Sequence, residues 1–500
     1  MAEHEAPEAS GAPGAVDRLR RDKDEKLTRL REQGVEPYPY RFERSATAAD
    51  CVANADAWVA EERELKLCGR LMSQRVMGKT SFGHLEDRSG SLQLFLRLDE
   101  LGEESYRRFT KLVEPGDHVG ATGALFVTRT GELSLKVRDW TLLAKAMLPL
   151  PEKYHGLTDP ELRARQRYLD LAANGDVRRN FETRSRMISF IRRFFEERGF
   201  LEVETPVLQP LYGGASARPF TTLHNALDTK LYLRIADELY LKRLIVGGME
   251  RVFEIGKIFR NEGMDRTHNP EFTMLEAYAA YWDYHDLMEL FETLYAQLAT
   301  ELTGSTRITY GEHTIDMAPP WPRLDYYEAL AKATGEDLRL APAEAVAALA
   351  TKHGIALEPG MNRGKLLDAL FAKLVEPGLI QPTFVMDHPK EISPLAKDHR
   401  SKPGQVERFE PFIATFEAGN AFSELNDPAE QRRRFEAQMG LRAKGDDEAQ
   451  VLDEDYIRAL EVGMPPTAGL GIGIDRLAML MTDAHHIREV LLFPMMRPEA

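Results

Sequence analysis

The sequence predicts an α+β protein in which a small β-rich domain precedes a larger domain of mixed strands and helices. Residues 65–143 contain five short runs of alternating apolar and polar residues, separated by turns. Residues 251–278 have the pattern of a strand, a charged loop and a returning strand. A glycine-rich stretch at residues 469–473 then precedes a helix. Together these stretches predict at least two domains.

The composition excludes several classes of protein. A chain of 500 residues is long enough for more than one core, since single cores stop growing near roughly 250–300 residues. Only two cysteines, Cys51 and Cys68, argue against a disulfide framework or a cysteine-rich zinc site, and they fit a reducing cytoplasm. No uncharged apolar run reaches the roughly 18 residues that a membrane span needs, and the N-terminus lacks the pattern of a signal peptide. Because the formal charge is −15, any site for a polyanion must be a local patch.

The N-terminal segment is expected to hold a tail and a helix. Residues 1–16 are acidic and rich in Ala, Pro and Gly, which predicts disorder. Residues 17–33 predict a helix in which leucines lie among seven basic residues. A solvated charged face and a phosphate-binding face are equally open interpretations of this helix.

The β-rich segment has the order of a small OB-type barrel, whose open face binds oligonucleotides. The expected strands are residues 65–73, 80–86, 91–97, 118–128 and 132–143, with a helix near 103–113 after the third strand. Phe82 and Gln93 are placed on neighbouring strands of the open face, with Arg75 and Glu132 nearby. An aromatic ring can stack an unpaired base, while amide and carboxylate groups read its edge. Taken alone, Phe82 fits a core position better.

The stretch MGKTSFGHLEDRSGSLQLF and the order of the five runs resemble the anticodon-binding domain of lysyl-tRNA synthetases. The resemblance implies that Arg75, Phe82, Gln93 and Glu132 bind the anticodon of tRNA(Lys).

The strand, loop and strand at residues 251–278 carry the most specific pattern in the chain. Arg260 stands at the end of the first strand, facing Glu262, His268 and Asn269 across the loop. An apolar core would leave these polar groups unsatisfied, so they form either an exposed charged hairpin or a binding site. The segments FRNEG and HNPEFTMLEAY resemble the second signature motif of class II aminoacyl-tRNA synthetases, in the form typical of lysyl-tRNA synthetases.

Two further stretches resemble the other class II motifs. A helix at residues 183–198, a strand at 200–203 and Thr205-Pro206 resemble motif 1, which implies a homodimer; a helix packing within one subunit is the alternative. The glycines of residues 469–473 would let a flat ring approach the backbone, with Arg476 stacked over it, and the stretch resembles motif 3.

Activating an amino acid requires positive charge rather than a base. The substrate carboxylate is already ionised when it attacks the α-phosphorus of ATP, so catalysis comes from alignment and from cations on the phosphates. Arg260 and Arg476 are the candidate catalytic cations. The resemblance implies that Glu417 and Glu424, in FEAGNAFSELND, hold Mg²⁺, although their spacing alone fits surface charge as well. The implied ATP-binding residues are Arg260, Glu262, His268, Asn269, Phe272, Glu417 and Arg476.

The resemblance also implies L-lysine as the substrate. A buried ammonium must meet carboxylates, because an unpaired buried charge costs several kcal/mol. Glu238, in RIADELYLKRL, matches the residue that receives the side-chain ammonium, and Glu276 lies near the α-amino group. An aspartyl enzyme would need cations at these positions instead. The implied lysine-binding residues are Gly214, Glu238, Arg260, Glu276, Tyr278, Asn420, Phe422 and Glu424.

The sequence departs from common bacterial members of the family at four points. A basic residue is usual where this chain has Phe416, a larger aliphatic residue where it has Ala418, and a proline where it has Asp237. These three changes leave the implied ligands in place. Thr267 precedes His268 where several members have arginine, which puts particular loop contacts to the tRNA acceptor stem in doubt.

The expected whole is a cytoplasmic, homodimeric lysine–tRNA ligase with an OB-fold barrel and a class II catalytic domain built on an antiparallel sheet flanked by helices. The expected segments are a tail at 1–16, a helical extension at 17–64, the barrel at 65–147, a linker at 148–180 and the catalytic domain at 181–500, with a helical insertion at 330–380 that shows no chemical motif. A lysyl ligase that modifies a protein and a non-catalytic RNA-binding paralogue remain as alternatives.

Overall fold

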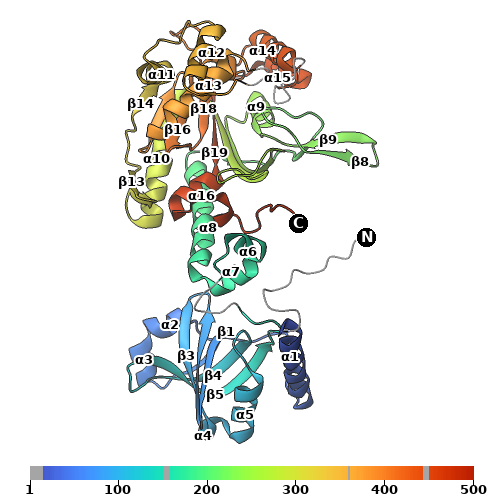
Figure 1. Ribbon diagram of the computed structural model, residues 1–500, viewed down its shortest axis with the longest axis vertical. Helices are drawn as coiled ribbons and strands as arrows, with labels where there is room; N and C mark the ends of the chain where they lie inside the picture. The colour runs from blue at the N-terminus through green and yellow to red at the C-terminus, as the bar shows by residue number, and fades with distance from the viewer. Residues whose placement is uncertain (1–14, 151–156, 358–360, 443–449, 500) are drawn as a thin grey trace. The chain divides into compact units, whose positions relative to one another are not determined.

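The computed structural model in Figure 1 describes residues 15–150, 157–357, 361–442 and 450–499. The chain divides into two compact units, Met1–Leu157 and Thr158–Ala500. Most of the tail expected at residues 1–16 lies outside the described residues, and its last two residues begin helix α1 (Ala15–Glu32).

The first unit is a closed five-stranded barrel with the strand order β1-β2-β3-β5-β4, drawn in blue to teal in Figure 1, and it confirms the predicted OB fold. Its strands are β1 (Glu64–Met77), β2 (Thr80–Asp87), β3 (Gly90–Arg97), β4 (His118–Val127) and β5 (Leu133–Ala144). Helices α4 (Leu98–Leu101) and α5 (Glu103–Leu112) follow the third strand, as the spacing predicts. The apolar residues of the alternating runs point inward and form a core rich in leucine and valine. Because successive side chains of a strand point to opposite faces, this burial produces the two-residue period that predicted the strands.

Helix α1 packs on the barrel through few residues. Leu30 is fully buried, and Lys23 and Lys26 reach Glu114, with Nζ–Oε distances of 3.9 Å and 2.6 Å. Two of the seven basic residues therefore have structural partners in the barrel. Two short helices, α2 (Ala48–Ala53) and α3 (Ala55–Ala60), connect α1 to β1.

The segment expected as a linker at 148–180 is folded where the structure describes it. It contains α6 (Pro160–Arg165), α7 (Arg167–Ala173) and the start of α8 (Gly175–Glu196). Arg167 is buried, pairs with Asp170, and donates to the backbone carbonyls of Arg488 and Leu492 at 2.7 Å and 3.1 Å. These partners lie more than 300 residues away in sequence, so local pattern could not reveal that the segment belongs to the larger unit.

The second unit is organised around a nine-stranded sheet with the order β14-β15-β16-β18-β19-β11-β10-β6, with β17 paired to β16. The strands between β15 and β10 pair antiparallel, as the family resemblance implies, whereas the pairs β14/β15 and β10/β6 are parallel. The strands are β6 (Leu201–Glu202), β10 (Arg251–Phe259), β11 (Glu271–Ala280), β14 (Arg323–Asp325), β15 (Thr383–Met386), β16 (Arg408–Ile413), β17 (Phe416–Glu417), β18 (Asn420–Ser423) and β19 (Thr467–Gly473).

Helices α8, α10 (Tyr284–Thr303) and α16 (Ile474–Thr482) cover the sheet and share its main apolar core. Helix α9 (Glu238–Val246) packs with α14 (Pro428–Arg442) and α15 (Glu454–Gly463) in a smaller core. A three-stranded ribbon contains β7 (Leu208–Gln209), β8 (Thr221–His224) and β9 (Thr229–Leu233), and a two-stranded one contains β12 (Arg307–Tyr310) and β13 (His313–Asp316).

The expected insertion is helical and has a core of its own. Helices α11 (Tyr326–Thr334), α12 (Ala343–Lys352) and α13 (Arg363–Leu374) pack around Leu330, Leu367 and Phe371. Val385 of β15 and Phe412 of β16 join this core, so the insertion is anchored on the edge of the sheet. Of the helices that the structure describes, none has the length and apolar character required to cross a bilayer.

Candidate active site

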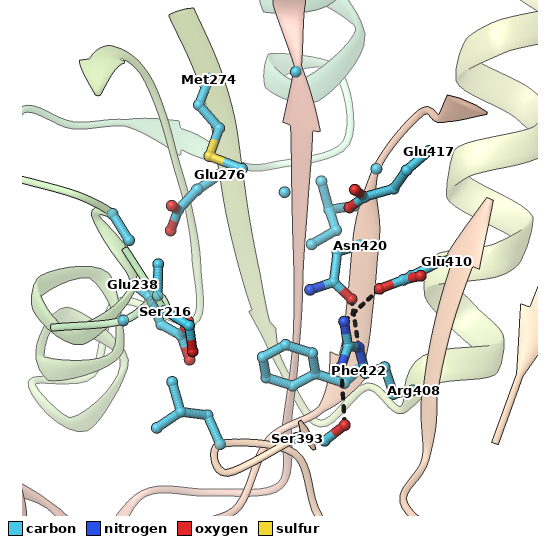
Figure 2. Close-up of a pocket in the computed structure, with 18 of the residues that line it drawn as sticks. Ser216, Glu238, Met274, Glu276, Ser393, Arg408, Glu410, Glu417, Asn420 and Phe422 are labelled. Atoms are coloured by element: carbon cyan, nitrogen blue, oxygen red, sulfur yellow. Dashed lines mark hydrogen bonds and ion pairs between the residues drawn. The ribbon is translucent and has the colours of Figure 1, made fainter. Parts of the chain in front are cut away.

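A cavity of about 560 Å³ lies over the centre of the large sheet. Twelve of the fourteen residues that the sequence assigned to lysine, ATP or the metal line it, namely Gly214, Glu238, Arg260, His268, Asn269, Phe272, Glu276, Tyr278, Glu417, Asn420, Phe422 and Arg476. The two exceptions are Glu262, which is exposed on the loop between β10 and β11, and Glu424, which lies behind the cavity wall. Figure 2 shows Glu238 and Glu276 on one side of the cavity and Glu410 and Glu417 on the other.

The register of three neighbouring strands places the side chains of the half of the cavity to which the sequence assigned lysine. Tyr278 on β11 lies opposite Gly469 on β19, and Phe422 on β18 pairs with the same glycine. A Cβ added at Gly469 would lie 2.3 Å from both the Tyr278 ring and Glu424 Oε1. The sequence predicted that this glycine makes room for a flat ring of the substrate. The structure corrects that interpretation, since Tyr278 and Glu424 occupy the room.

Three carboxyl groups, Glu238, Glu276 and Glu424, form a buried acidic cluster. Burial raises the pKa of Glu276 to about 7, with the charge of Glu238 adding to the shift. Burial likewise raises the pKa of Glu424 to about 8, although Lys242 opposes the shift. Glu276 is held from two sides, by the Asp237 N–H and by the Tyr278 hydroxyl, both at 3.1 Å. The cluster is therefore a site for cations in an enclosed, low-dielectric setting.

Lys242 is a member of this cluster that the sequence analysis did not single out. Its side chain is fully enclosed, and its Nζ donates to Glu238 Oε1 at 2.6 Å and to Glu424 Oε2 at 2.5 Å. Burial alone would lower the pKa of Lys242, but Glu238 and Glu424 raise it well above its usual value. The i,i+4 spacing of Glu238 and Lys242 on α9 was the available signal.

Asp237, one of the four points at which the sequence departs from the family that it resembles, supports the cluster through its backbone. Its backbone N–H, which a proline would lack, is the donor to Glu276. Its own carboxyl is fully buried beside Arg234, and burial raises its pKa to about 9. Arg234 Nη1 also donates to Glu254 Oε1 at 2.6 Å, and Gly256 leaves the space for this guanidinium.

The cationic half of the cavity contains Arg260 and Arg476. The Arg260 guanidinium lies 5.2 Å from the Phe272 ring, and its Nε is buried without a hydrogen-bond partner among the described residues. Arg476 Nη1 donates to the Glu417 carbonyl at 3.0 Å, and its Nη2 lies 2.9 Å from His268 Nε2. An unpartnered buried donor beside a second guanidinium is suited to an anionic ligand such as a carboxylate or phosphate.

Glu410 and Glu417, from the adjacent strands β16 and β17, face this cationic half. Burial raises the pKa of Glu417, and the charge of Glu410 raises it further. Neighbouring carboxylates of this kind fit a divalent cation that draws its remaining ligands from phosphate oxygens. Across the residues that the structure describes, no cluster of three or more His, Cys, Asp or Glu side chains forms a ready-made metal site. Glu424, the second carboxylate that the sequence assigned to the metal, pairs with Lys242, and Glu410 pairs in the same way with Arg408.

The helical insertion also reaches the cavity. Asn362, Lys365 and Asp368 from the start of α13 line it, so the insertion has a place in the site that its sequence did not reveal. Burial raises the pKa of Asp368 to about 6, and the nearby charge of Glu410 contributes.

The barrel carries the second candidate site. Arg75, Phe82 and Phe95 lie opposite one another on β1, β2 and β3, so they share a face. The rings of Phe82 and Phe95 are 5.0 Å apart, and Phe126 continues the row at 5.2 Å from Phe95. The sequence identified Phe82 but missed the other two rings, whose positions follow only from the register.

The polar groups predicted for this face are close to it. Gln93 is buried and accepts a hydrogen bond from the Ser134 hydroxyl at 2.8 Å. Exposed Glu132 lies 3.2 Å from His84 Nε2, and His84 was not predicted. The face therefore combines half-buried rings with polar edges, as single-stranded nucleic-acid sites do.

Comparison with known proteins gives a consistent result for both units. Residues 159–497 match the family described as "tRNA synthetases class II (D, K and N)", and residues 65–143 match the "OB-fold nucleic acid binding domain". A lysine–tRNA ligase of Moorella thermoacetica is 54% identical over 476 residues, which cover 95% of this chain and 97% of that protein. Those of Oceanobacillus iheyensis and Aquifex aeolicus are 52% and 54% identical, over 96% and 87% of this chain and 98% and 74% of theirs.

Proposed function

The chain belongs to the class II tRNA synthetases of the D, K and N group, and from this premise we propose that it is a lysine–tRNA ligase. It activates L-lysine with ATP to lysyl-adenylate and transfers the lysyl group to the 3′ end of tRNA(Lys). The observation that carries the choice of lysine is the buried cluster of Glu238, Glu276 and Glu424 at one end of the cavity. Aspartate would bring a second carboxylate into this acidic setting, which electrostatics opposes.

The chemical step follows from the cationic half. A lysine carboxylate oxygen attacks the α-phosphorus, the bond from that phosphorus to the oxygen bridging to the β-phosphate breaks, and pyrophosphate leaves. Arg260 holds the carboxylate and an α-phosphate oxygen together, and its unpartnered Nε supports this role. Arg476 neutralises charge on the phosphates, with Glu417 and His268 fixing its guanidinium. His268, Asn269 and Phe272 complete the ATP side. Glu262, which lies off the cavity wall, is assigned to ATP through its charge near Arg260.

Lysine is oriented by contacts at both ends. Its α-ammonium lies near Gly214 and Glu276, and its side-chain ammonium is directed to Glu238, Tyr278 and Glu424. Phe422 and Asn420 form the wall between them; Asn420 Oδ1 accepts a hydrogen bond from Arg408 Nε at 2.9 Å, which fixes its amide.

Mg²⁺ is assigned to Glu417, with Glu424 or Glu410 as the second carboxylate. Glu424 pairs with Lys242 and Glu410 pairs with Arg408, so pairing with a cation does not separate them; the resemblance favours Glu424, and the position on the cavity wall favours Glu410. When bound, Mg²⁺ neutralises phosphate oxygens and helps to orient the triphosphate.

The barrel binds the anticodon of tRNA(Lys), with Phe82 stacking a base and Arg75, Gln93 and Glu132 contacting its edge or backbone. The row of three rings supports this assignment.

The enzyme acts as a cytoplasmic homodimer in this proposal. Near the segment that resembles motif 1, Leu201 and Leu208 are about half-exposed, at 53% and 48%. A subunit interface would cover such side chains, which is in keeping with the proposed dimer. Sedimentation velocity at micromolar concentration tests the dimer, and a monomer there rejects it.

Pyrophosphate exchange with each of the twenty amino acids tests the activity itself. Exchange with lysine and not with aspartate or asparagine is the expected result. A lysyl ligase acting on proteins would charge no tRNA, and a non-catalytic paralogue would show no exchange with any amino acid.

A further inference from the structure

Lys242 is an internal ammonium group inside the proposed lysine pocket. Its side chain is fully enclosed between Glu238 and Glu424, and its Nζ lies 5.8 Å and 5.6 Å from the centres of the Phe422 and Tyr456 rings. An ammonium enclosed in this way keeps its proton only because both carboxylates are its partners. Lys242 is therefore a permanent cation of the pocket and not a mobile surface charge.

The contacts of Lys242 leave other acceptors of the pocket available. Lys242 donates to Oε2 of Glu424, while Oε1 of Glu424 is buried and has no hydrogen-bond partner among the described residues. Glu238 gives Oε1 to Lys242 and still lines the cavity. Glu276 receives only neutral donors, the Asp237 N–H and the Tyr278 hydroxyl. The cluster thus has acceptor capacity for more cations than Lys242 alone.

The net charge of the cluster is the central quantity. When Glu238, Glu276 and Glu424 are ionised, they contribute three negative charges and Lys242 one positive charge, which leaves a net charge of −2. A lysine molecule brings two ammonium groups, so it neutralises the enclosed cluster, while its carboxylate pairs with Arg260. A neutral side chain such as that of norleucine brings one ammonium group and leaves one buried negative charge uncompensated.

On the premise that the protein activates lysine, we propose that Lys242 is a positioning residue that sets the pocket charge to match an amino acid with two ammonium groups. It acts through Glu238 and Glu424 and does not touch the substrate. Without Lys242, the three ionised carboxylates would have a charge of −3, one more than the two ammonium groups of lysine can neutralise. With Lys242 but one carboxylate fewer, the charge would be −1, which matches an amino acid with a single ammonium group.

If Lys242 acts by setting the charge of the pocket, variants should behave differently from those expected if it only fills space. In Glu238→Gln, the remaining charge of the cluster is −1, so the ratio of lysine affinity to norleucine affinity should fall. In Glu238→Gln with Lys242→Met, the charge returns to −2, and the ratio should rise again by at least about tenfold over Glu238→Gln alone, within the usual range of coupling between contacting residues. If Lys242 only fills space, the double variant should bind both lysine and norleucine more weakly, with no recovery of the ratio.

The experiment is calorimetric titration of the wild type, Lys242→Met, Glu238→Gln and the double variant with lysine and with norleucine. The ratio cancels general damage, since misfolding lowers both affinities together. The pair Glu424→Gln and Lys242→Met repeats the test independently, should the first double variant fail to fold. Recovery of the ratio in either pair supports the proposal, and no recovery in folded variants of both pairs overturns it. A wild type that fails to bind lysine would reject the proposed function itself.

Discussion

In the barrel, the rings of Phe82 and Phe95 lie half-buried with their centres 5.0 Å apart. In the cavity of the larger unit, by contrast, Glu276 and Glu424 are only 4% and 1% exposed. A half-exposed ring can stack any base, because every base has a π-face. An enclosed carboxylate accepts only a ligand that supplies the missing positive charge. Under the proposed function, the barrel would provide affinity for an extended polymer, whereas the cavity would select one small molecule.

The largest expected effect is on the cavity side, where a buried cation has no substitute. Arg260→Ala should lower lysine-dependent pyrophosphate exchange by about 10²–10³-fold, the usual cost of removing a preorganised group that stabilises the transition state. Lys257→Ala, an exposed residue on the same strand, is the matched control and should keep the wild-type rate. Exchange within a few-fold of wild type in Arg260→Ala would remove this residue from the catalytic step.

The next experiment separates the two acidic groups within the cavity. Glu424→Gln should raise the KM for lysine by at least about tenfold, because it removes a charged hydrogen-bond partner. The Mg²⁺ concentration needed for half-maximal exchange should rise in Glu424→Gln if Glu424 is the second metal ligand, and in Glu410→Gln if Glu410 is. A Mg²⁺ titration that neither variant changes would reject both assignments.

The barrel gives a more moderate effect that is confined to the tRNA. Phe82→Ala should weaken tRNA binding by roughly 1–3 kcal/mol, the contribution of one base–aromatic stack. Exchange without tRNA should be unaffected, since activation involves no RNA. Val76→Ala, at an exposed apolar position on β1, serves as the control. Wild-type charging by Phe82→Ala at subsaturating tRNA would show that Phe82 is only part of the barrel wall.

The remaining expected effect is a pH dependence that the barrel should not share. The pKa of Glu276 is raised to about 7 and that of Glu424 to about 8, so below these values the carboxyls are neutral and attract an ammonium poorly. Lysine affinity should therefore rise between pH 6 and 8, by up to about tenfold per pH unit for each carboxyl that must ionise. Arg260, Lys242 and Tyr278 face these carboxyls and keep their charge states across this range, because the pKa values of Lys242 and Tyr278 are raised well above their usual values and a guanidinium stays protonated. Glu238, whose pKa burial also raises, titrates together with Glu276 and Glu424. A flat profile in calorimetric titration would mean that both carboxyls are ionised before lysine binds.

The difference between the two regions also explains what the sequence revealed. The five barrel strands were predictable because each buries alternate residues, and period two is visible in a single strand. Arg260 and Glu276 were found because they lie in a long motif that resembles a known family. Glu410 and Lys365 were missed because their places on the cavity wall depend on how β16 and α13 pack, which no local pattern encodes. Lys242 had a local signal in its i,i+4 spacing to Glu238, but its pairing with Glu424, 182 residues away, did not follow from it. The same reason explains why Arg167, bound to carbonyls at the other end of the chain, was assigned to a linker.

Gly469 limits how the substrate range of this enzyme can be engineered. Since even a methyl group there would overlap Tyr278 and Glu424, directed evolution towards acylated or longer lysines has no usable substitution at this position. Libraries should instead vary Ala236 and Phe422, which line other walls of the cavity. In a saturation library at position 469, glycine is expected to be the sole residue recovered among active clones.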